Sequence, residues 1–272
     1  MTPWDPRGSG AGRRRFQLDR NTTIIVGVAV VLIIVIVAKH KISSAQLIYF
    51  CVLIPSIILH ELSHGVVALG FGDPTAKRAG RLSLNPLKHV DPVGTLLVPA
   101  VLTLSGVGAY GWAKPVPVMT NNLRSPRNHT VIVSLVGPVT NFVLAAIMGV
   151  CLVAVGGRAN IDAQLAQLGS EVGAQSVNLY PYVQISSFSL IQQIFFYAGF
   201  ANIILGVFNM IPCPPLDGAA ILERFIPQRY LAGYYNLQPF LMFLPFILIL
   251  LFHGAWDSLV NHLINWYLQI IG

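Results

Sequence analysis

The sequence predicts an all-α, polytopic membrane protein with about five to six transmembrane helices and a small membrane-associated β-hairpin. Of the 272 residues, 54% are hydrophobic and only 10% are charged, whereas a soluble domain carries about a quarter charged residues. Several apolar stretches are long enough, or nearly so, to cross a hydrocarbon core of about 30 Å. Most basic residues lie in a few segments between these stretches. Lipid is therefore expected to surround most of the chain.

The chain begins with a basic tail and continues into the predicted intramembrane domain, residues 22–252. Residues 1–21 are polar and rich in Gly, Pro and Arg, so we expect a disordered tail. Segment 93–109 is short and contains Pro99 and three glycines, so we expect it to be re-entrant or only partly inserted. The expected spans are the stretches 22–38, 45–70, 130–155, 190–211 and 230–252.

Two other segments predict smaller elements. Residues 72–92 alternate basic and small or apolar residues and end in turn residues, which predicts a β-hairpin at 75–90. Residues 253–272 repeat apolar residues at helical spacing and include two tryptophans, which predicts an amphipathic helix along the membrane interface.

The net charge of +7 indicates a topology and not a nucleic-acid partner. Fourteen of the 17 Lys and Arg lie in the tail, between residues 77 and 127, or in the turn at 224–229. If these regions face the cytosol, the distribution follows the positive-inside rule. The sequence therefore predicts an integral, multi-pass protein with a cytosolic N-terminus and loop 156–186 on the other side. The lipid bilayer is its expected surroundings, and no nucleic acid is expected to bind.

A short motif inside the second apolar stretch carries the chemistry. His60, Glu61 and His64 form HExxH, and residues i and i+4 share one face of a helix, so both imidazoles can bind one metal ion. Glu61 can then reach a water molecule beside the metal. Two core histidines bonded to backbone are the alternative, but ionisable groups in a span need a compensating partner, which a metal supplies. His89 and His129 are expected to be solvated loop residues.

A third ligand must come from elsewhere, because catalytic zinc usually takes three protein ligands. The chain has only seven Asp and three Glu, and Asp217 stands out among them because it follows a span in a proline-broken stretch. Prolines at 212, 214 and 215 prevent a regular helix, and a broken helix at membrane depth can present a polar group into a cavity. From the residues alone, Asp217 could equally cap a helix restarting at Gly218.

The two motifs together resemble the site-2 protease family of intramembrane zinc metalloproteases, peptidase family M50. HExxH is followed by Asn-x-x-Pro-x-Pro-Pro-Leu-Asp-Gly at 209–218, and the resemblance covers about residues 45–225. It includes "GPVTNF" at 137–142 and the loop sequences "DPTAKRAGRLSLNPLKHVDPVGT" and "GWAKPVPV". We expect neither the PDZ-like insertion nor the CBS domain of larger members. The chain therefore looks like a minimal member, which suggests a prokaryotic plasma membrane or an organelle descended from one.

The resemblance implies one zinc ion per chain and a protein substrate that spans the membrane. Zinc would be held by the HExxH histidines and Asp217, with Glu61 as general base. Asn141 and Asn209 would lie near the substrate backbone or the developing oxyanion, and the hairpin would pair with an unwound substrate. Read without the resemblance, both asparagines could equally hydrogen-bond between helices.

The function expected from these residues is hydrolysis of peptide bonds within or near transmembrane segments. Two alternatives stay open. A catalytically inactive scaffold that binds membrane helices would not need Glu61, which is present. A metal or proton transporter would favour ionisable residues strung across several depths, whereas the expected topology gathers them in the inner half of the membrane. The sequence leaves the oligomeric state open.

Overall fold

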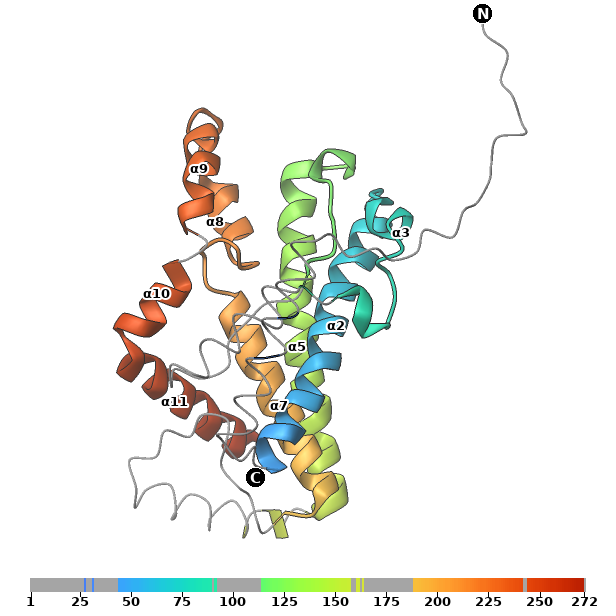
Figure 1. Ribbon diagram of the computed structural model, residues 1–272, viewed down its shortest axis with the longest axis vertical. Helices are drawn as coiled ribbons and strands as arrows, with labels where there is room; N and C mark the ends of the chain where they lie inside the picture. The colour runs from blue at the N-terminus through green and yellow to red at the C-terminus, as the bar shows by residue number, and fades with distance from the viewer. Residues whose placement is uncertain are drawn as a thin grey trace, which may run out of the picture.

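Three long helices form the centre of the protein. In the computed structural model, α2 (Ser44–Gly70), α5 (Pro126–Gly156) and α7 (Leu190–Asn209) run side by side, each packed against the other two (Figure 1). Each is long and apolar enough to cross a membrane, which gives three candidate spans among the described residues. The structure describes residues 27, 31, 44–89, 91, 114–157, 160, 161, 163, 188–241 and 244–271.

These helices coincide, to within a few residues, with three of the expected apolar stretches. Within the described ranges the protein is helical and contains no strand. The predicted spans 22–38 and 93–109 lie outside the described residues, apart from Gly27 and Val31. The tail 1–21 and most of loop 156–186 lie outside them as well.

Local signals fix where two of the central helices begin and end. α5 begins with Pro126 in its first turn, where proline lacks only a hydrogen bond that the helix would not make. It ends before Gly157, whose φ of 71° suits a residue without a side chain. α7 begins with a capping box, in which Ser189 accepts from the Gln192 backbone and the Gln192 side chain accepts from Ser189.

Apolar and small side chains join the three helices. Lipid offers helices no hydrophobic driving force for association, so close packing with small residues at the contacts stabilises the bundle. Gly206 of α7 is one example, since a Cβ there would lie 2.8 Å from the ring of Phe142 on α5. The buried cluster consists of Ala45, Tyr49, Val52, Ala145, Leu152, Ile161, Phe188, Phe196, Tyr197, Ala198, Phe200, Ala201, Ile203, Ile204 and Tyr267.

The predicted hairpin at 75–90 is wrong for the residues described there. They form helix α3 (Thr75–Arg78), a turn at Gly80 with φ of 64°, and the 3-10 helix η1 (Pro86–Lys88). The Asn85 side chain caps η1 by accepting from the Leu87 backbone at 3.0 Å. Alternating small and basic residues therefore accompany a succession of turns here, because Gly80 and Pro86 favour local turns over a ladder.

The predicted fifth span is divided into shorter helices. After α7 the chain forms α8 (Ala219–Phe225), α9 (Gln228–Leu241), α10 (Leu244–Leu251) and α11 (His253–Ile271). The stretch 230–252 therefore contains two helices where one was expected. Pro245 lies in the first turn of α10, a position that proline tolerates.

The C-terminal helix α11 packs against the bundle. Tyr267 is buried in the central cluster, and its hydroxyl lies against Gly199 of α7, where a Cβ would collide with it. The helix predicted at 253–272 is thus present, and its position along the membrane interface stays a prediction.

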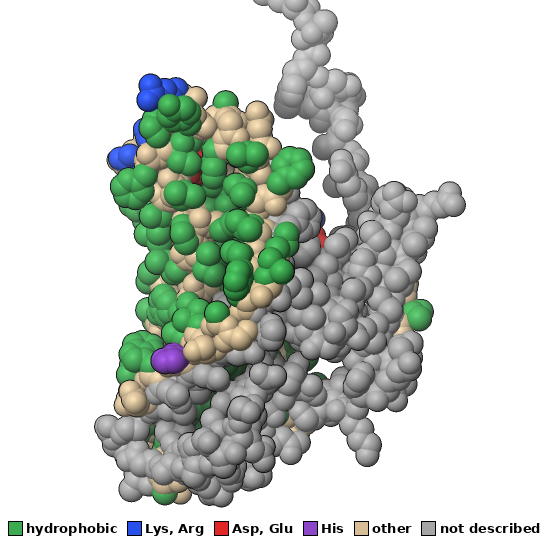
Figure 2. Space-filling model, turned by 90° about the vertical axis from the view of Figure 1, so that its left-hand side faces the viewer, with side chains coloured by type: hydrophobic (Ala, Val, Ile, Leu, Met, Phe, Trp, Pro, Cys, Tyr) green, Lys and Arg blue, Asp and Glu red, His purple; other side chains and the backbone are tan. Residues whose placement is uncertain are grey.

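Basic side chains from two of the three expected cytosolic regions lie at one end of the bundle. Arg127, at the start of α5, donates to the carbonyls of Arg224 and Ile226 at 2.9 and 3.0 Å, so the loop after α8 meets the beginning of α5. Helix α3, the start of α5 and helices α8 and α9 share the upper end in Figure 1. Figure 2 shows Lys and Arg gathered at the upper edge of a largely hydrophobic face.

Candidate metal centre

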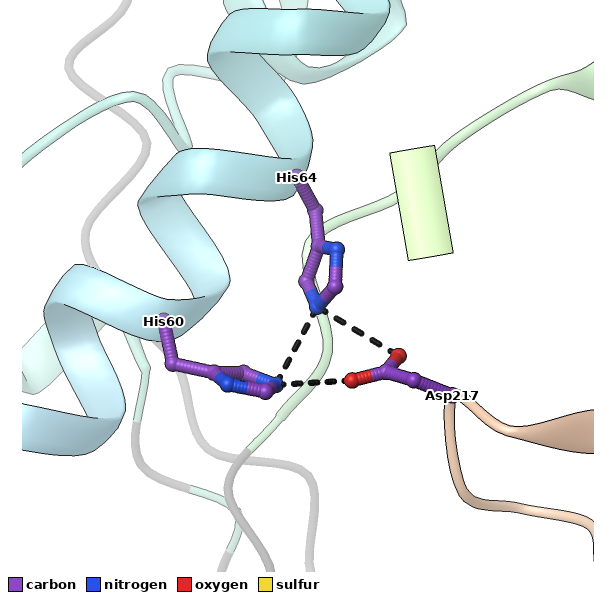
Figure 3. Close-up of side chains that lie close together, drawn as sticks. All are labelled: His60, His64 and Asp217. Carbon is purple, nitrogen blue, oxygen red and sulfur yellow. Dashed lines mark hydrogen bonds and ion pairs between the residues drawn. The ribbon is translucent and has the colours of Figure 1, made fainter. Parts of the chain in front are cut away.

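The two HExxH histidines and Asp217 form one cluster. The Nε2 atoms of His60 and His64, both on α2, lie 3.1 Å apart. The Asp217 carboxylate reaches both, with Oδ2 3.0 Å from His60 Nε2 and Oδ1 3.4 Å from His64 Nε2. Figure 3 shows the imidazoles and the carboxylate pointing toward one another from separate segments. Residues 157 positions apart in the chain are therefore adjacent in the fold.

The segment after α7 is shaped to bring Asp217 to the histidines. The Gly218 N–H donates to the carbonyl of Asn209 at 2.7 Å, which closes the loop onto the end of α7. A Cβ on Gly218 would collide with the carbonyls of Met210 and Ile211, so the loop requires glycine there. Helix α8 follows with no side-chain cap at its first residue. Asp217 thus faces the histidines and does not cap α8.

The hydrogen bond of His64 Nδ1 orients the ring so that Nε2 faces the cluster. Its Nδ1 lies 2.6 Å from the backbone carbonyl of Val133 on α5. A carbonyl only accepts hydrogen bonds, so Nδ1 carries the proton; in the neutral imidazole, the form that binds metal, Nε2 then keeps a lone pair.

The second nitrogen of His60 contacts Asn141. Nδ1 lies 3.1 Å from the Asn141 side-chain nitrogen, while Asn141 Oδ1 is buried without a hydrogen-bond partner. The two ends of an amide are assigned from such contacts, and exchanging them lets Oδ1 accept from the His60 Nδ1–H. Asn141 then has its acceptor satisfied, and His60 Nε2 keeps a lone pair as well.

The donor set fits a metal cation. The cluster offers one carboxylate oxygen and the Nε2 atoms of two imidazoles, with ligand atoms all within 4.8 Å of one another. Three buried acceptors repel one another unless a cation lies among them. Two His and one carboxylate are a common protein set for zinc with one position left open.

Helix α5 packs directly against the histidine rings. A Cβ on Gly137 would lie 2.5 Å from His64 Cε1 and Nε2 and 2.6 Å from His60 Cε1, so only glycine leaves room for both imidazoles. Pro138 follows and is fully buried. The small residue at this position lets α5 come close enough for the Val133 carbonyl and Asn141 to reach the rings.

Glu61 lies beside the cluster and contacts a different segment. Its Oε2 accepts a hydrogen bond of 2.8 Å from the backbone N–H of Val116. The carboxylate is therefore held by a residue 55 positions later in the chain, in the segment that precedes α5.

The two predicted asparagines differ in their contacts. Asn141 is fully buried and lies against His60. Asn209 donates to the carbonyl of Leu205 in its own helix at 2.9 Å. Their roles beside a substrate or an oxyanion stay predictions. His89, expected to be solvated, is only 3% exposed, and its Nε2 lies 2.8 Å from the carbonyl of Ser83.

Sequence reasoning does not identify three residues in or against the segment that contacts Glu61. Val116 contributes only its backbone, so nothing in its side chain marks it. Arg81 stands among other basic residues of one loop, which made it look like part of the topological charge signal. Asp73 lies three residues after the end of α2, and no sequence pattern marks it as a buried carboxylate. Its full burial could be seen only in the fold.

Comparison with known proteins identifies the family. A family model described as peptidase family M50 matches residues 48–252, well over half of the chain. The chain belongs to peptidase family M50. The family is one of metalloproteases, so the resemblance seen in HExxH and the later Asp motif is confirmed.

Two relatives show how far the M50 similarity extends. YwhC of Bacillus subtilis strain 168, named as a proposed zinc metalloprotease, is 38% identical over 176 residues, which cover 64% of this chain and 67% of YwhC. Rip2 of Mycolicibacterium smegmatis, named likewise, is 31% identical over 182 residues, which cover 65% of this chain and 58% of Rip2. The chain thus spans little more than half the length of Rip2. No solved structure gives a significant match.

Proposed function

We propose that this M50 chain is an intramembrane zinc endopeptidase that hydrolyses peptide bonds within or near transmembrane segments of other proteins. The observation that carries the proposal is the cluster of His60, His64 and Asp217, with Glu61 on the same helix as the histidines. Both histidines lie within a candidate membrane span, Leu47–Gly70. A hydrolytic centre at that position would meet membrane segments before it met soluble peptides.

The three clustered residues would hold one zinc ion per chain. Zinc is the metal in the names of YwhC and Rip2. When bound, zinc polarises a substrate carbonyl and makes water a better nucleophile. Val133 and Asn141 support the site by engaging the Nδ1 atoms of the histidines, which leaves each Nε2 free to bind metal.

The remaining steps belong to the side chains of this protein. Glu61 accepts the proton of the attacking water and then returns a proton to the leaving amine. Asn141 and Asn209 are the candidates for contacts to the substrate backbone or the oxyanion. Asn141, fully buried against His60, would have to become exposed to do this, so we also assign it the orientation of that ring.

The setting of the enzyme follows from its helices and charges. We propose a multi-pass protein of a prokaryotic plasma membrane with a cytosolic N-terminus. Its domain would cover 22–252, with a core of 45–225, a basic tail before it and an interfacial helix after it. A membrane-spanning substrate would have to unwind, because helical carbonyls are already hydrogen-bonded.

Glu61→Gln tests the hydrolytic mechanism. The substitution is nearly isosteric and leaves the three proposed ligands in place, while the proton acceptor is lost. Loss of a general base costs roughly 10²–10⁴ in rate. Purified Glu61→Gln should therefore keep zinc and capture a single-span substrate without cleaving it. Cleavage by this variant at the wild-type rate with zinc bound would exclude the mechanism. A transporter or an inactive scaffold predicts no difference in cleavage between the two proteins.

A further inference from the structure

The segment Lys114–Met119 lies against α2 beside the cluster. A Cβ on Gly65, the residue after His64, would lie 2.9 Å from Val116 Cγ1 and 2.5 Å from Leu82 Cδ2. Val116 is buried, and its side chain fills the space above Gly65. This contact places the Val116 N–H where it donates to Glu61 at 2.8 Å.

One end of the segment is held by Arg81. The guanidinium donates from Nη2 to the carbonyls of Lys114 and Pro115 at 2.6 and 3.2 Å, and from Nη1 to the carbonyl of Lys88. The Lys114 N–H also donates to the carbonyl of His89 at 2.9 Å. Burial lowers the pKa of Arg81, and the negative charge of Glu61 acts in the opposite direction, so the two charges are near enough to interact.

The other end is held by Asp73. Its carboxylate is fully buried and accepts from the backbone N–H of Met119 at 2.6 Å and from the Asn122 side chain at 3.0 Å. Thr75 donates to the same carboxylate from its backbone at 3.0 Å and from its hydroxyl. Asp73 follows α2 by three residues, so this tether joins the segment to the helix that carries Glu61.

Two prolines limit the backbone hydrogen bonds that the segment Lys114–Met119 can donate. Pro115 and Pro117 have no N–H, and each favours extended backbone in the residue before it. Val116 therefore carries a backbone N–H between two residues that lack one. Its hydrogen bond to Glu61 satisfies a buried backbone group that would be costly to leave without a partner.

We propose that Arg81 and Asp73 are positioning residues for catalysis. They hold the segment Lys114–Met119 at both ends, so that the Val116 N–H occupies one carboxylate oxygen of Glu61 and directs the other toward the attacking water. This inference rests on the proposed function, because it assigns a task to residues around the same general base. A misplacement of about 1 Å at a reacting group can cost on the order of 100-fold in rate.

Val116→Pro tests the inference most directly, because it removes the donor at a position already flanked by prolines. We expect kcat to fall about tenfold to a hundredfold with KM little changed. Arg81→Lys keeps the positive charge but cannot reach the carbonyls of Lys88, Lys114 and Pro115 together, and it should change kcat in the same direction. Arg78→Lys is the matched control for Arg81→Lys, since Arg78 is exposed and no side-chain hydrogen bond of Arg78 occurs among the described residues. It should cleave at close to the wild-type rate.

Measurements on the substrate-trapping variant separate positioning from structural damage. In the Glu61→Gln background, Val116→Pro and Arg81→Lys should leave zinc content and substrate capture unchanged. Loss of zinc or of capture in either double variant would overturn the inference, as would wild-type or raised kcat in either single variant. Failure of the proposed function is distinct: the wild-type protein would then not cleave, or would cleave without Glu61.

Discussion

At the scale of single residues, the absence of a side chain at Gly137 lets helix α5 pack directly against both imidazoles. The rings of His60 and His64 lie T-shaped, with centroids 4.7 Å apart. Their Nδ1 atoms contact α5 on the same side. A side chain at Gly137 would separate α5 from the rings and so remove both contacts.

Gly137→Ala should therefore weaken zinc binding without removing a ligand. The added methyl group would lie 2.5 Å from His64 and must displace the ring or the helix. Loss of the contacts that orient metal ligands typically costs about 10- to 100-fold in affinity. Competition with a zinc chelator would measure the change. Gly70→Ala is the control because a Cβ at Gly70 meets nothing within 4 Å. Equal zinc affinity in both variants would show that the packing at Gly137 is not needed.

Asp217→Ala tests the third ligand. Two imidazoles alone leave zinc with one ligand fewer than catalytic sites usually have, so the purified variant should lose most of its zinc. Metal analysis beside activity is the measurement, because loss of activity alone does not prove ligation. Glu223→Gln changes another acid, which contacts Tyr235, and should retain zinc. Full zinc occupancy and wild-type activity in Asp217→Ala would exclude the assignment.

At the scale of elements, buried polar tethers hold the irregular segments against the helices. The link at Asp73 joins the end of α2 to the segment before α5. Burial raises the pKa of Asp73, but the hydrogen bonds it accepts from Thr75, Asn122 and Met119 outweigh burial and hold the pKa below its ordinary value. The ionised form is thus favoured in the folded protein.

This pKa gives a pH dependence with a definite sign. A lowered folded pKa means that the stabilisation is fully present above the unfolded pKa of about 3.9 and is lost as the pH falls through the folded pKa. Asp73→Asn should lower the free energy of unfolding at pH 7 by about 1–3 kcal/mol, because hydrogen bonds to the carboxylate are lost. The difference between the two proteins should shrink toward pH 3. A difference independent of pH would show that the ionised carboxylate is not what stabilises the link.

At the scale of the whole molecule, the charged end and the candidate site share one side of the bundle. Asp217 lies in the loop between α7 and α8, and Arg127 joins the beginning of α5 to the loop after α8. If the basic end faces the cytosol, the site opens toward the cytosolic half of the membrane.

Labelling of single cysteines tests this orientation. In a background without the three free cysteines, Cys51, Cys151 and Cys213, an impermeant thiol reagent added outside should modify a cysteine placed at Ser170. The same reagent should not reach one placed at Ser83, in the loop between α3 and η1. Lysis should expose the second position. Labelling with the reverse pattern would place the site in the opposite leaflet.

Features that depend on local geometry could be predicted from the sequence. A helical repeat places His60 and His64 on one face wherever the helix lies, and apolar length predicts the three central helices. Local pattern failed where several local structures suit the same residues: the stretch at 75–90 turns where a hairpin was expected, and 230–252 forms two helices.

The contacts between these residues and distant groups depend on the tertiary fold. It brought Asp217 to the histidines, placed Gly137 against their rings and put the Val116 N–H on Glu61. Such contacts depend on how α2, α5 and α7 pack and on where the connecting segments are tied. The backbone N–H of Val116 and the missing side chain of Gly137 matter only because of where they lie. The packing of all the helices together sets those positions.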